Sequence, residues 1–167
     1  MPHYRKNPNH KPEYGINCAT CALAYVLRLR GFDVTAKGNV KGTKNHDISK
    51  MGIGYFDIWK NPDGSKAEPM TTAQWAKKNG LSEMTHDAYK SYFEEVCKDK
   101  GVYILTVNWK EGGGHATILQ RDEDGHLYHI EPQVYESHKT ADGRRSIDGL
   151  ISHLTLKPLD YRGILRV

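Results

Sequence analysis

The sequence predicts an α+β fold in which a cysteine-bearing helix near the N-terminus packs on an antiparallel β-sheet. Three observations lead to this prediction. Helix-prone segments come first along the chain, whereas β-rich segments dominate its second half. The first helical segment has one continuous apolar face, which requires a large partner surface. Residues 122–125 form a short turn sequence between two β-rich segments, and a hairpin turn pairs its strands antiparallel.

The first helix is predicted over residues 18–30. Asn17 is a suitable N-cap, and Gly31 suits the left-handed position that follows a helix. Side chains that are apolar or small recur at helical spacing along it: Cys18, Cys21, Ala22, Tyr25, Val26 and Leu29. This face predicts that the helix packs on the sheet. Residues 32–36 are predicted to follow as a short strand.

The middle of the chain is predicted to hold a long irregular segment and two short helices. Residues 37–70 are rich in Gly, Lys, Asn and Asp, and we expect them to select the substrate because long loops are often functional. One helix is predicted from Thr71 or Thr72 to a closing Gly80. The other is capped by Thr85 and closed by Gly101.

The second half of the chain is predicted to form the sheet. The β-rich runs have alternating or continuous apolar residues and are separated by turn residues. The predicted strands are Val102–Trp109, His115–Gln120 and His126–Glu131, with one or two more from Ile147–Leu156 and Gly163–Val167.

Composition bounds the class of protein. The chain has 167 residues, of which 38% are hydrophobic and 26% charged, a globular composition. The net charge of +4 comes from residues spread along the chain, and it does not favour nucleic-acid binding. No apolar run approaches the roughly 20 residues that cross a bilayer. The basic first residues have no apolar stretch behind them, so we expect no Sec signal peptide.

Cys18 is the candidate nucleophile. The first turn of a helix presents unpaired N–H groups and the positive end of the helix dipole, so the thiol pKa is expected to fall there. Three cysteines are too few for a disulfide scaffold and favour a reduced compartment or a catalytic thiol. Cys21 lies one turn further on and stays open as the alternative nucleophile or a resolving cysteine. The other interpretation is that both are small buried hydrophobic residues.

His115 and Glu131 are the candidate base and its partner. His115 follows three glycines and opens a predicted strand, and Glu131 ends the strand that pairs with it. Their separation of 16 residues (131 − 115) matches two strands joined by a hairpin turn, which makes them neighbours. A histidine there can take a thiol proton, and a carboxylate can hold the ring and stabilise its charged form. Taken singly, each could equally be an ordinary surface residue.

Two blocks of this sequence resemble the papain-like fold toxin domains. The first block begins Asn17-Cys18-Ala-Thr-Cys21-Ala and runs to Ala36. The second contains Gly-His-Ala-Thr-Ile around His115 and later Glu131-Pro-Gln. In that family a His opens one strand and an Asp-Pro-Gln triplet ends the next, so this chain has Glu where the family usually shows Asp.

The resemblance implies a papain-like α+β domain over residues 17–167, preceded by an extended lead-in over residues 1–16. It implies Cys18 as nucleophile, His115 as base and Glu131 as the third member of the triad. Asn17 is expected to help bind the oxyanion, and Gln133 to contact substrate or orient the site. The chemistry needs no organic cofactor and no metal.

The resemblance also implies a function. The family includes polymorphic and effector toxins of bacteria and domains attached to phage head proteins, and its better-understood relatives are glutamine deamidases and cysteine proteases. We therefore expect a toxin that deamidates a glutamine of a protein in the target-cell cytoplasm, after delivery by a non-Sec route. Proteolysis is the alternative, and the residues do not choose between them. A cognate immunity protein is expected for an antibacterial toxin, and no membrane partner is expected.

Three other classes of protein stay open. Cys18 and Cys21 form a CxxC at a helix start, which is also the arrangement of a dithiol redox protein. Together with His126 and His129 they offer four zinc-type ligands, although strand alternation places the two histidines on opposite faces. A non-enzymatic phage or injection-particle module, or a nucleic-acid binder, is the third.

Overall fold

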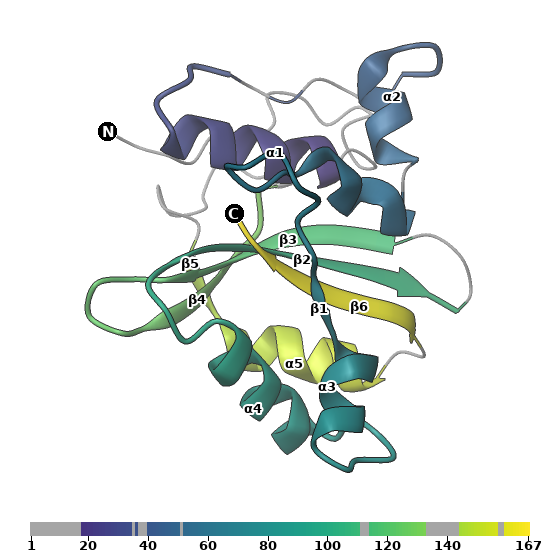
Figure 1. Ribbon diagram of the computed structural model, residues 1–167, viewed down its shortest axis with the longest axis vertical. Helices are drawn as coiled ribbons and strands as arrows, with labels where there is room; N and C mark the ends of the chain where they lie inside the picture. The colour runs from purple at the N-terminus through teal and green to yellow at the C-terminus, as the bar shows by residue number, and fades with distance from the viewer. Residues whose placement is uncertain are drawn as a thin grey trace.

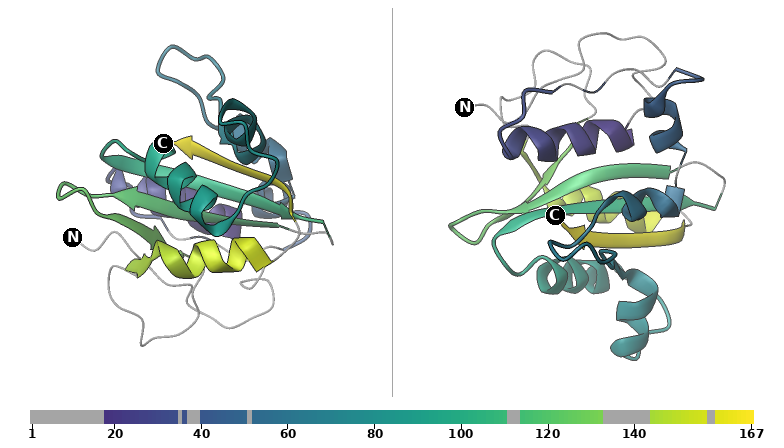
Figure 2. Two further views of the ribbon diagram at one scale, coloured as in Figure 1. Left: turned by 90° about the horizontal axis from the view of Figure 1, so that it is seen from below. Right: turned by 45° about the horizontal axis from the view of Figure 1, so that its top comes forward.

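The computed structural model describes residues 18–34, 36, 40–50, 52–110, 114–132, 144–156 and 159–167. Its centre is a six-stranded sheet in the order β1-β6-β2-β3-β4-β5, in which every pair of neighbours is antiparallel. Helical segments cover both faces of this sheet (Figures 1 and 2). The strands are β1 (Met70–Thr71), β2 (Gly101–Trp109), β3 (Gly114–Arg121), β4 (Leu127–Ile130), β5 (Arg144–Ser146) and β6 (Leu159–Arg166). The predicted α+β class with an antiparallel sheet is confirmed.

One face of the sheet is covered by α1 (Cys18–Leu29) together with α2 (Lys44–Ser49) and the 3₁₀ helix η2 (Gly52–Ile58). Gly31 has a φ of +96°, and the Phe32 N–H donates to the Leu27 carbonyl at 3.0 Å, the C-terminal closure predicted for this helix. The strand predicted over residues 32–36 is wrong for the described residues 32–34 and 36, which are irregular. Phe32 is 59% exposed. The described residues of this segment do not extend the sheet, whose edge strands are β1 and β5.

The prediction of an irregular segment over residues 37–70 is wrong in part. Thr43 caps α2 by accepting a hydrogen bond from the His46 N–H. The helix η2 places Tyr55 and Phe56 in the core, each 2% exposed. This apolar pair on a short helical turn therefore anchors a stretch whose polar composition suggested a loop.

The other face is covered by α3 (Thr72–Lys78), α4 (His86–Val96) and α5 (Ile147–Leu156). Thr71 caps α3 in a capping box with Gln74, and Thr85 caps α4, as predicted. However, α4 ends at Val96, and Gly101 belongs to β2 rather than closing the helix.

Residues 147–156 form a helix where a strand was predicted. Their β-branched residues suggested a strand, but the apolar residues recur at helical spacing. Ile147, Ile151 and Leu154 are all buried against the sheet, and Leu150 is half-buried beside them. The predicted strand at the C-terminus is confirmed as β6, which begins earlier than predicted and lies between β1 and β2.

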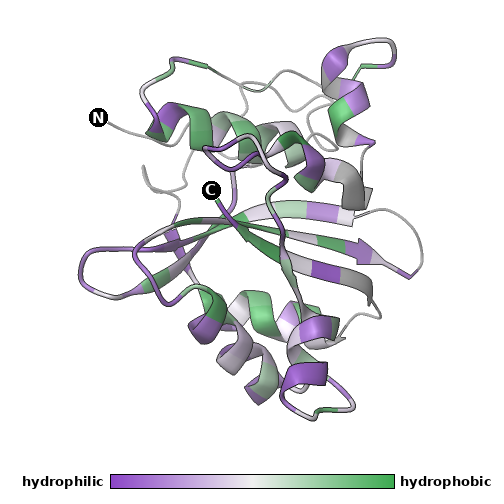
Figure 3. Ribbon diagram, in the orientation of Figure 1, coloured by the Kyte–Doolittle hydropathy of each residue, from purple (hydrophilic) through white to green (hydrophobic). Residues whose placement is uncertain are grey.

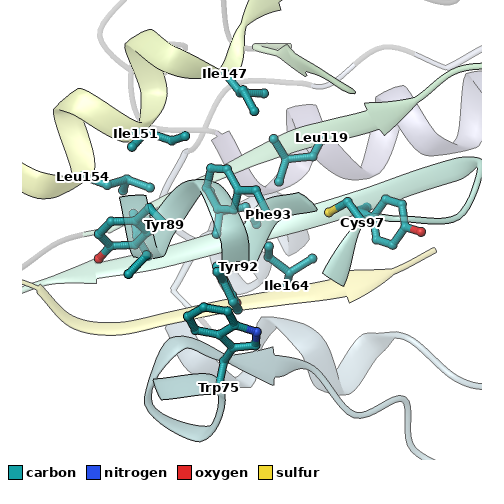
Figure 4. Packing of buried hydrophobic residues seen from close by; sticks show 14 residues of the cluster. Trp75, Tyr89, Tyr92, Phe93, Cys97, Leu119, Ile147, Ile151, Leu154 and Ile164 are labelled. Carbon is teal, nitrogen blue, oxygen red and sulfur yellow. The ribbon is translucent and has the colours of Figure 1, made fainter. Parts of the chain in front are cut away.

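The sheet separates two apolar clusters because successive side chains of a strand point to opposite faces. On β2, Ile104 packs on the α1 side, whereas Tyr103 and Leu105 pack on the α4 and α5 side. The hydropathy colouring of Figure 3 shows apolar segments along α1 and α5, on either side of the strands. Figure 4 shows the second cluster, in which aromatic rings of α3 and α4 lie against the strands and α5.

Candidate active site

The β3–β4 hairpin brings His115 and Glu131 together. The two strands are paired from Arg121–Leu127 to Ile118–Ile130, so Glu131, which follows β4, lies near the start of β3 on the face that carries His115. His115 Nε2 and Glu131 Oε2 are 2.5 Å apart. The glutamate side chain is therefore long enough to reach the imidazole from the residue that follows β4.

The turn that sets this register is built from local hydrogen bonds. Asp122 Oδ1 accepts from the N–H groups of Asp124 and His126 at 3.0 and 2.9 Å, and Gly125 has a φ of +84°. These bonds hold the hairpin in one register. A slip of one residue would move every side chain of the strand to the opposite face of the sheet.

Cys18 begins α1 and lies at the start of β3. The Ala116 N–H donates to the Cys18 sulfur, and the thiol group is also hydrogen-bonded to the His115 side chain. The β3–β4 pairing extends only to Ile118–Ile130, so at Ala116 the sulfur takes up an N–H on this edge of β3. The structure thus brings together Cys18, His115 and Glu131, the three residues that the sequence singles out.

The imidazole ring of His115 is held from two sides. Its Nε2 is bonded to Glu131, which leaves Nδ1 for the Cys18 thiol. The His115 side chain is 30% exposed and that of Glu131 only 12%. The ring is therefore reachable by a substrate, while the carboxylate behind it is shielded from water.

The electrostatics favour a charged pair. Burial acts to raise the pKa of the Cys18 thiol, but the hydrogen bond and positive charge of His115 and the Ala116 N–H outweigh it and lower that pKa. Burial acts to lower the pKa of His115, but the negative charge of Glu131 and the hydrogen bonds to Cys18 and Glu131 raise it well above 6.5. Both shifts favour a thiolate beside an imidazolium, and the thiolate is the nucleophilic form of cysteine.

Thr117 and His129 support this site; the sequence singled out His129 only as a possible zinc ligand and did not single out Thr117. Thr117 Oγ1 donates to the Ile130 carbonyl at 2.9 Å, so it accepts from the His129 ring at 2.7 Å. His129 Nε2 is 3.9 Å from Glu131 Oε2, and burial lowers the pKa of His129 to about 4. A neutral, buried histidine thus packs behind the carboxylate. Alternation along β3 and β4 was the available signal, because the side chains of His115, Thr117, His129 and Glu131 share one face of the sheet.

Tyr55 is the other residue that sequence reasoning missed. Its hydroxyl donates to the Ala19 carbonyl at 2.9 Å, in the first turn of α1 next to Cys18. Burial and the charge of a Cys18 thiolate both raise the pKa of Tyr55, so the hydroxyl keeps its proton and its bond. No spacing in the sequence links residue 55 to residue 19, so only the fold could show this contact.

The structure explains why one of the three glycines that precede His115, Gly114, has to be a glycine. A Cβ at this position would lie 2.4 Å from the Val107 carbonyl oxygen and 2.7 Å from Asn108 Oδ1. Any other residue would therefore push β3 away from β2 at the point where His115 begins.

The remaining candidates are placed as follows. Asn17 and Gln133 lie outside the described residues, so their expected roles stay predictions. Cys21 is 2% exposed and buried in α1, one turn below Cys18. Between the two cysteines, the contacts with His115 and Ala116 belong to Cys18.

The zinc alternative is not supported by the placement of its residues. In the described part of the chain, the group of side chains close enough to share a metal ion is Asp122, Asp124 and His126, on the hairpin turn. Cys18 instead faces His115, and His129 is bonded to Thr117. The Asp122 carboxylate already accepts two N–H groups of the turn.

Comparisons with known proteins do not assign the chain to a family. A search against models of protein families finds no match, and no curated protein matches it in sequence. Among the described residues, no helix is long and apolar enough to cross a membrane.

Proposed function

We propose that this protein is a thiol-dependent amidohydrolase of papain-like architecture. The observation that carries the proposal is the position of the His115 ring, which is hydrogen-bonded to Cys18 on one side and to Glu131 on the other. Nucleophile, base and orienting carboxylate in this order are what amide hydrolysis through a thioester requires. A helix start, a strand start and a strand end supply them, as in the related toxin domains.

The reaction proceeds in two stages. The Cys18 thiolate attacks the amide carbonyl carbon, and the resulting oxyanion is stabilised by the backbone N–H of Cys18 at the start of α1. His115 gives its proton to the leaving nitrogen, so an amine or ammonia departs and a thioester remains. His115, now neutral, takes a proton from water, and the hydroxide attacks the thioester carbonyl carbon. The carbon–sulfur bond then breaks, the carboxylic acid leaves, and the Cys18 thiolate again faces the His115 imidazolium.

Glu131 remains a carboxylate throughout. Its bond to Nε2 keeps Nδ1 aimed at the sulfur and stabilises the positive ring in the resting state. The neutral His129 behind it adds no opposing positive charge.

The substrate class follows from the resemblance to papain-like toxin domains. We take it to be a glutamine side chain of a protein in a target cell, which is converted to glutamate with release of ammonia. An effector or toxin that reaches the target cytoplasm by a non-Sec route, with a cognate immunity protein in the producing cell, is the matching biological role. Cleavage of a peptide bond would use the same residues.

The test is mass spectrometry of target-cell proteins after incubation with the wild type, Cys18→Ala and Cys21→Ser. Deamidation replaces an amide NH2 by OH at a glutamine, whereas proteolysis creates new termini. The wild type and Cys21→Ser are expected to make the same product, and Cys18→Ala none. A product that persists with Cys18→Ala contradicts the proposal, and one that is lost only with Cys21→Ser points to dithiol redox chemistry.

A further inference from the structure

A pocket of about 310 Å³ opens next to His115, on the side of the sheet that carries α5. Its floor is formed by the buried side chains of Leu105, Val107 and Leu154. Its rim includes Leu150 and His153 of α5 and Trp109 at the end of β2. The His115 imidazole is part of its wall, so the pocket borders the proposed active site.

The chemistry of the wall is apolar. None of the described lining residues is Asp, Glu, Lys or Arg. Thr117 also lines it, but its hydroxyl already bonds to His129 and the Ile130 carbonyl. The His115 Nε2 is bonded to Glu131. The floor itself carries no charge, and the His115 ring in the wall is already paired with the Glu131 carboxylate, so a charged group that entered the floor would lose its hydration without an unpaired ionic partner there.

The size of the pocket limits its occupant. Pockets that hold drug-sized ligands run from about 300 to 1,000 Å³, so this one is at the lower end. It suits one side chain of the size of leucine or methionine rather than a larger organic molecule. The edge-on contact of Trp109 with His153, at 5.5 Å between ring centroids, gives the rim an aromatic border.

We propose that this pocket binds one apolar side chain of the protein substrate, close in the substrate's sequence to the amide that Cys18 attacks. The inference rests on the proposed function, because His115 links pocket and nucleophile. Its consequence is a substrate class: an amide accompanied, within a few residues, by leucine, methionine or a similar side chain. The pocket thereby anchors the substrate beside His115, on the α5 side of β3.

The experiment uses glutamine peptides made otherwise of Gly and Ser, in which a single leucine is moved from one position to the next on either side of the glutamine. Burying a leucine side chain improves binding by about tenfold to a hundredfold. We expect kcat/KM to rise by that factor at one leucine position, with alanine giving a smaller gain and lysine or aspartate none. The same peptides are titrated into Cys18→Ala, so that binding is measured without turnover.

Two variants change the pocket in opposite directions. Leu150→Trp fills it from the half-buried rim and is expected to remove the leucine preference. Trp109→Ala enlarges it and is expected to shift the preference toward larger apolar residues. Ser152→Trp, at an exposed position of the same helix outside the pocket, is the matched control and keeps the wild-type preference.

The failures of the two proposals give different results. If the wild type hydrolyses every peptide at one rate and Leu150→Trp has the preference of the wild type, the pocket is not a substrate site, although the hydrolase stands. If no peptide is hydrolysed but Cys18→Ala binds the leucine peptides and Leu150→Trp abolishes that binding, the pocket is a binding site and the hydrolase fails. If no peptide binds any tighter than its alanine counterpart, the inference is overturned.

Discussion

The length of the Glu131 side chain determines whether its carboxylate can reach His115 in the proposed triad. Its carboxylate reaches His115 Nε2 from a residue that follows the end of β4, and the backbone there is set by the pairing of Ile130 with Ile118. An aspartate at this position would be one methylene shorter. An aspartate would therefore reach the imidazole only if the two strands approached each other slightly differently.

We expect Glu131→Gln and Glu131→Asp both to reduce kcat/KM, by about 100-fold or more, because the imidazole loses its orienting charge or its contact. In Glu131→Gln the alkaline limb of the rate profile also moves to lower pH, since the carboxylate no longer raises the pKa of His115. Glu123→Gln, which changes an exposed carboxylate of the hairpin turn, is the control. Full activity in Glu131→Gln would remove this residue from the triad.

The reactivity of Cys18 toward iodoacetamide should depend on pH in a specific way. The pKa of this thiol is lowered from 9.0 and that of His115 is raised, so the thiolate–imidazolium pair persists between the two values. Alkylation is expected to stay fast at pH values well below 9.0 and to fall only as pH drops through the lowered pKa of Cys18.

Mass mapping of the adduct identifies the residue. Cys21 and Cys97 are buried, and burial raises the pKa of Cys97 well above 9.0, so a single adduct at Cys18 is expected in the folded protein. Alkylation that rises only as pH approaches 9.0, as for a free thiol, would contradict the charged pair.

At the scale of elements, the hairpin that carries His115 is tied to α4 by one buried arginine. Arg121 Nε donates to the Cys97 carbonyl, its Nη1 to the Gly125 carbonyl and its Nη2 to Glu94, all at 2.8 Å. One side chain therefore joins the end of α4, the end of β3 and the turn before β4. This arrangement fixes the hairpin from behind, far from the reacting groups.

We expect Arg121→Met to lower the free energy of unfolding by about 2 kcal/mol, because the buried Cys97 carbonyl and the more exposed Gly125 carbonyl both lose their donor. Glu94→Gln removes only the half-exposed end of this network and is expected to change stability by less than about 1 kcal/mol. Urea denaturation of the two variants provides the comparison. Equal stability of both would show that the carbonyl bonds contribute nothing beyond the surface ion pair.

The first turn of α1 is fixed by the element that sequence reasoning treated as irregular. Tyr55 of η2 is fully buried and bonds to Ala19, one residue after the proposed nucleophile. The α1 helix itself packs on β3, and both elements contribute to one apolar cluster that includes Ala22, Val26, Ala116 and Ile118. The sulfur is thus positioned by contacts from two directions, which is the rigidity that a catalytic group requires.

At the scale of the whole molecule, the buried His129 links the site to acid stability. Its pKa is lowered from 6.5 to about 4, so between these values the unfolded chain binds a proton that the folded chain does not. Stability therefore falls as pH is lowered from 6.5 toward 4, by up to about 1.4 kcal/mol per pH unit from this group.

We expect His129→Gln to have a shallower fall of unfolding free energy over this pH range, because its amide carries no titrating proton while keeping a donor toward Thr117. His126→Asn, at an exposed histidine of the hairpin turn, is expected to retain the slope of the wild type. Denaturation series at several pH values measure the difference. Identical slopes in the wild type and His129→Gln would show that His129 is protonated in the folded protein.

Much of the local structure could be predicted from the sequence because its signals are local. Caps at Thr71 and Thr85, the closing Gly31 and the hairpin turn before β4 are each decided by a few neighbouring residues. The helix over residues 147–156 was missed because β-branched residues were weighed above the helical spacing of its apolar side chains. The short strand expected at residues 32–36 failed because a strand needs a partner, which no local signal supplies.

The sequence by itself determined which groups could perform the chemistry: a thiol at a helix start, an imidazole after three glycines and a carboxylate 16 residues beyond it. Only the tertiary structure decided that Cys18 rather than Cys21 meets the imidazole, that Tyr55 and His129 support the site, and that an apolar pocket adjoins it. The physical reason is the distance along the chain over which each interaction acts. Capping and hairpin register act over a few residues, whereas a contact between residues 18 and 115 depends on how the helix and the sheet bury their apolar faces against each other.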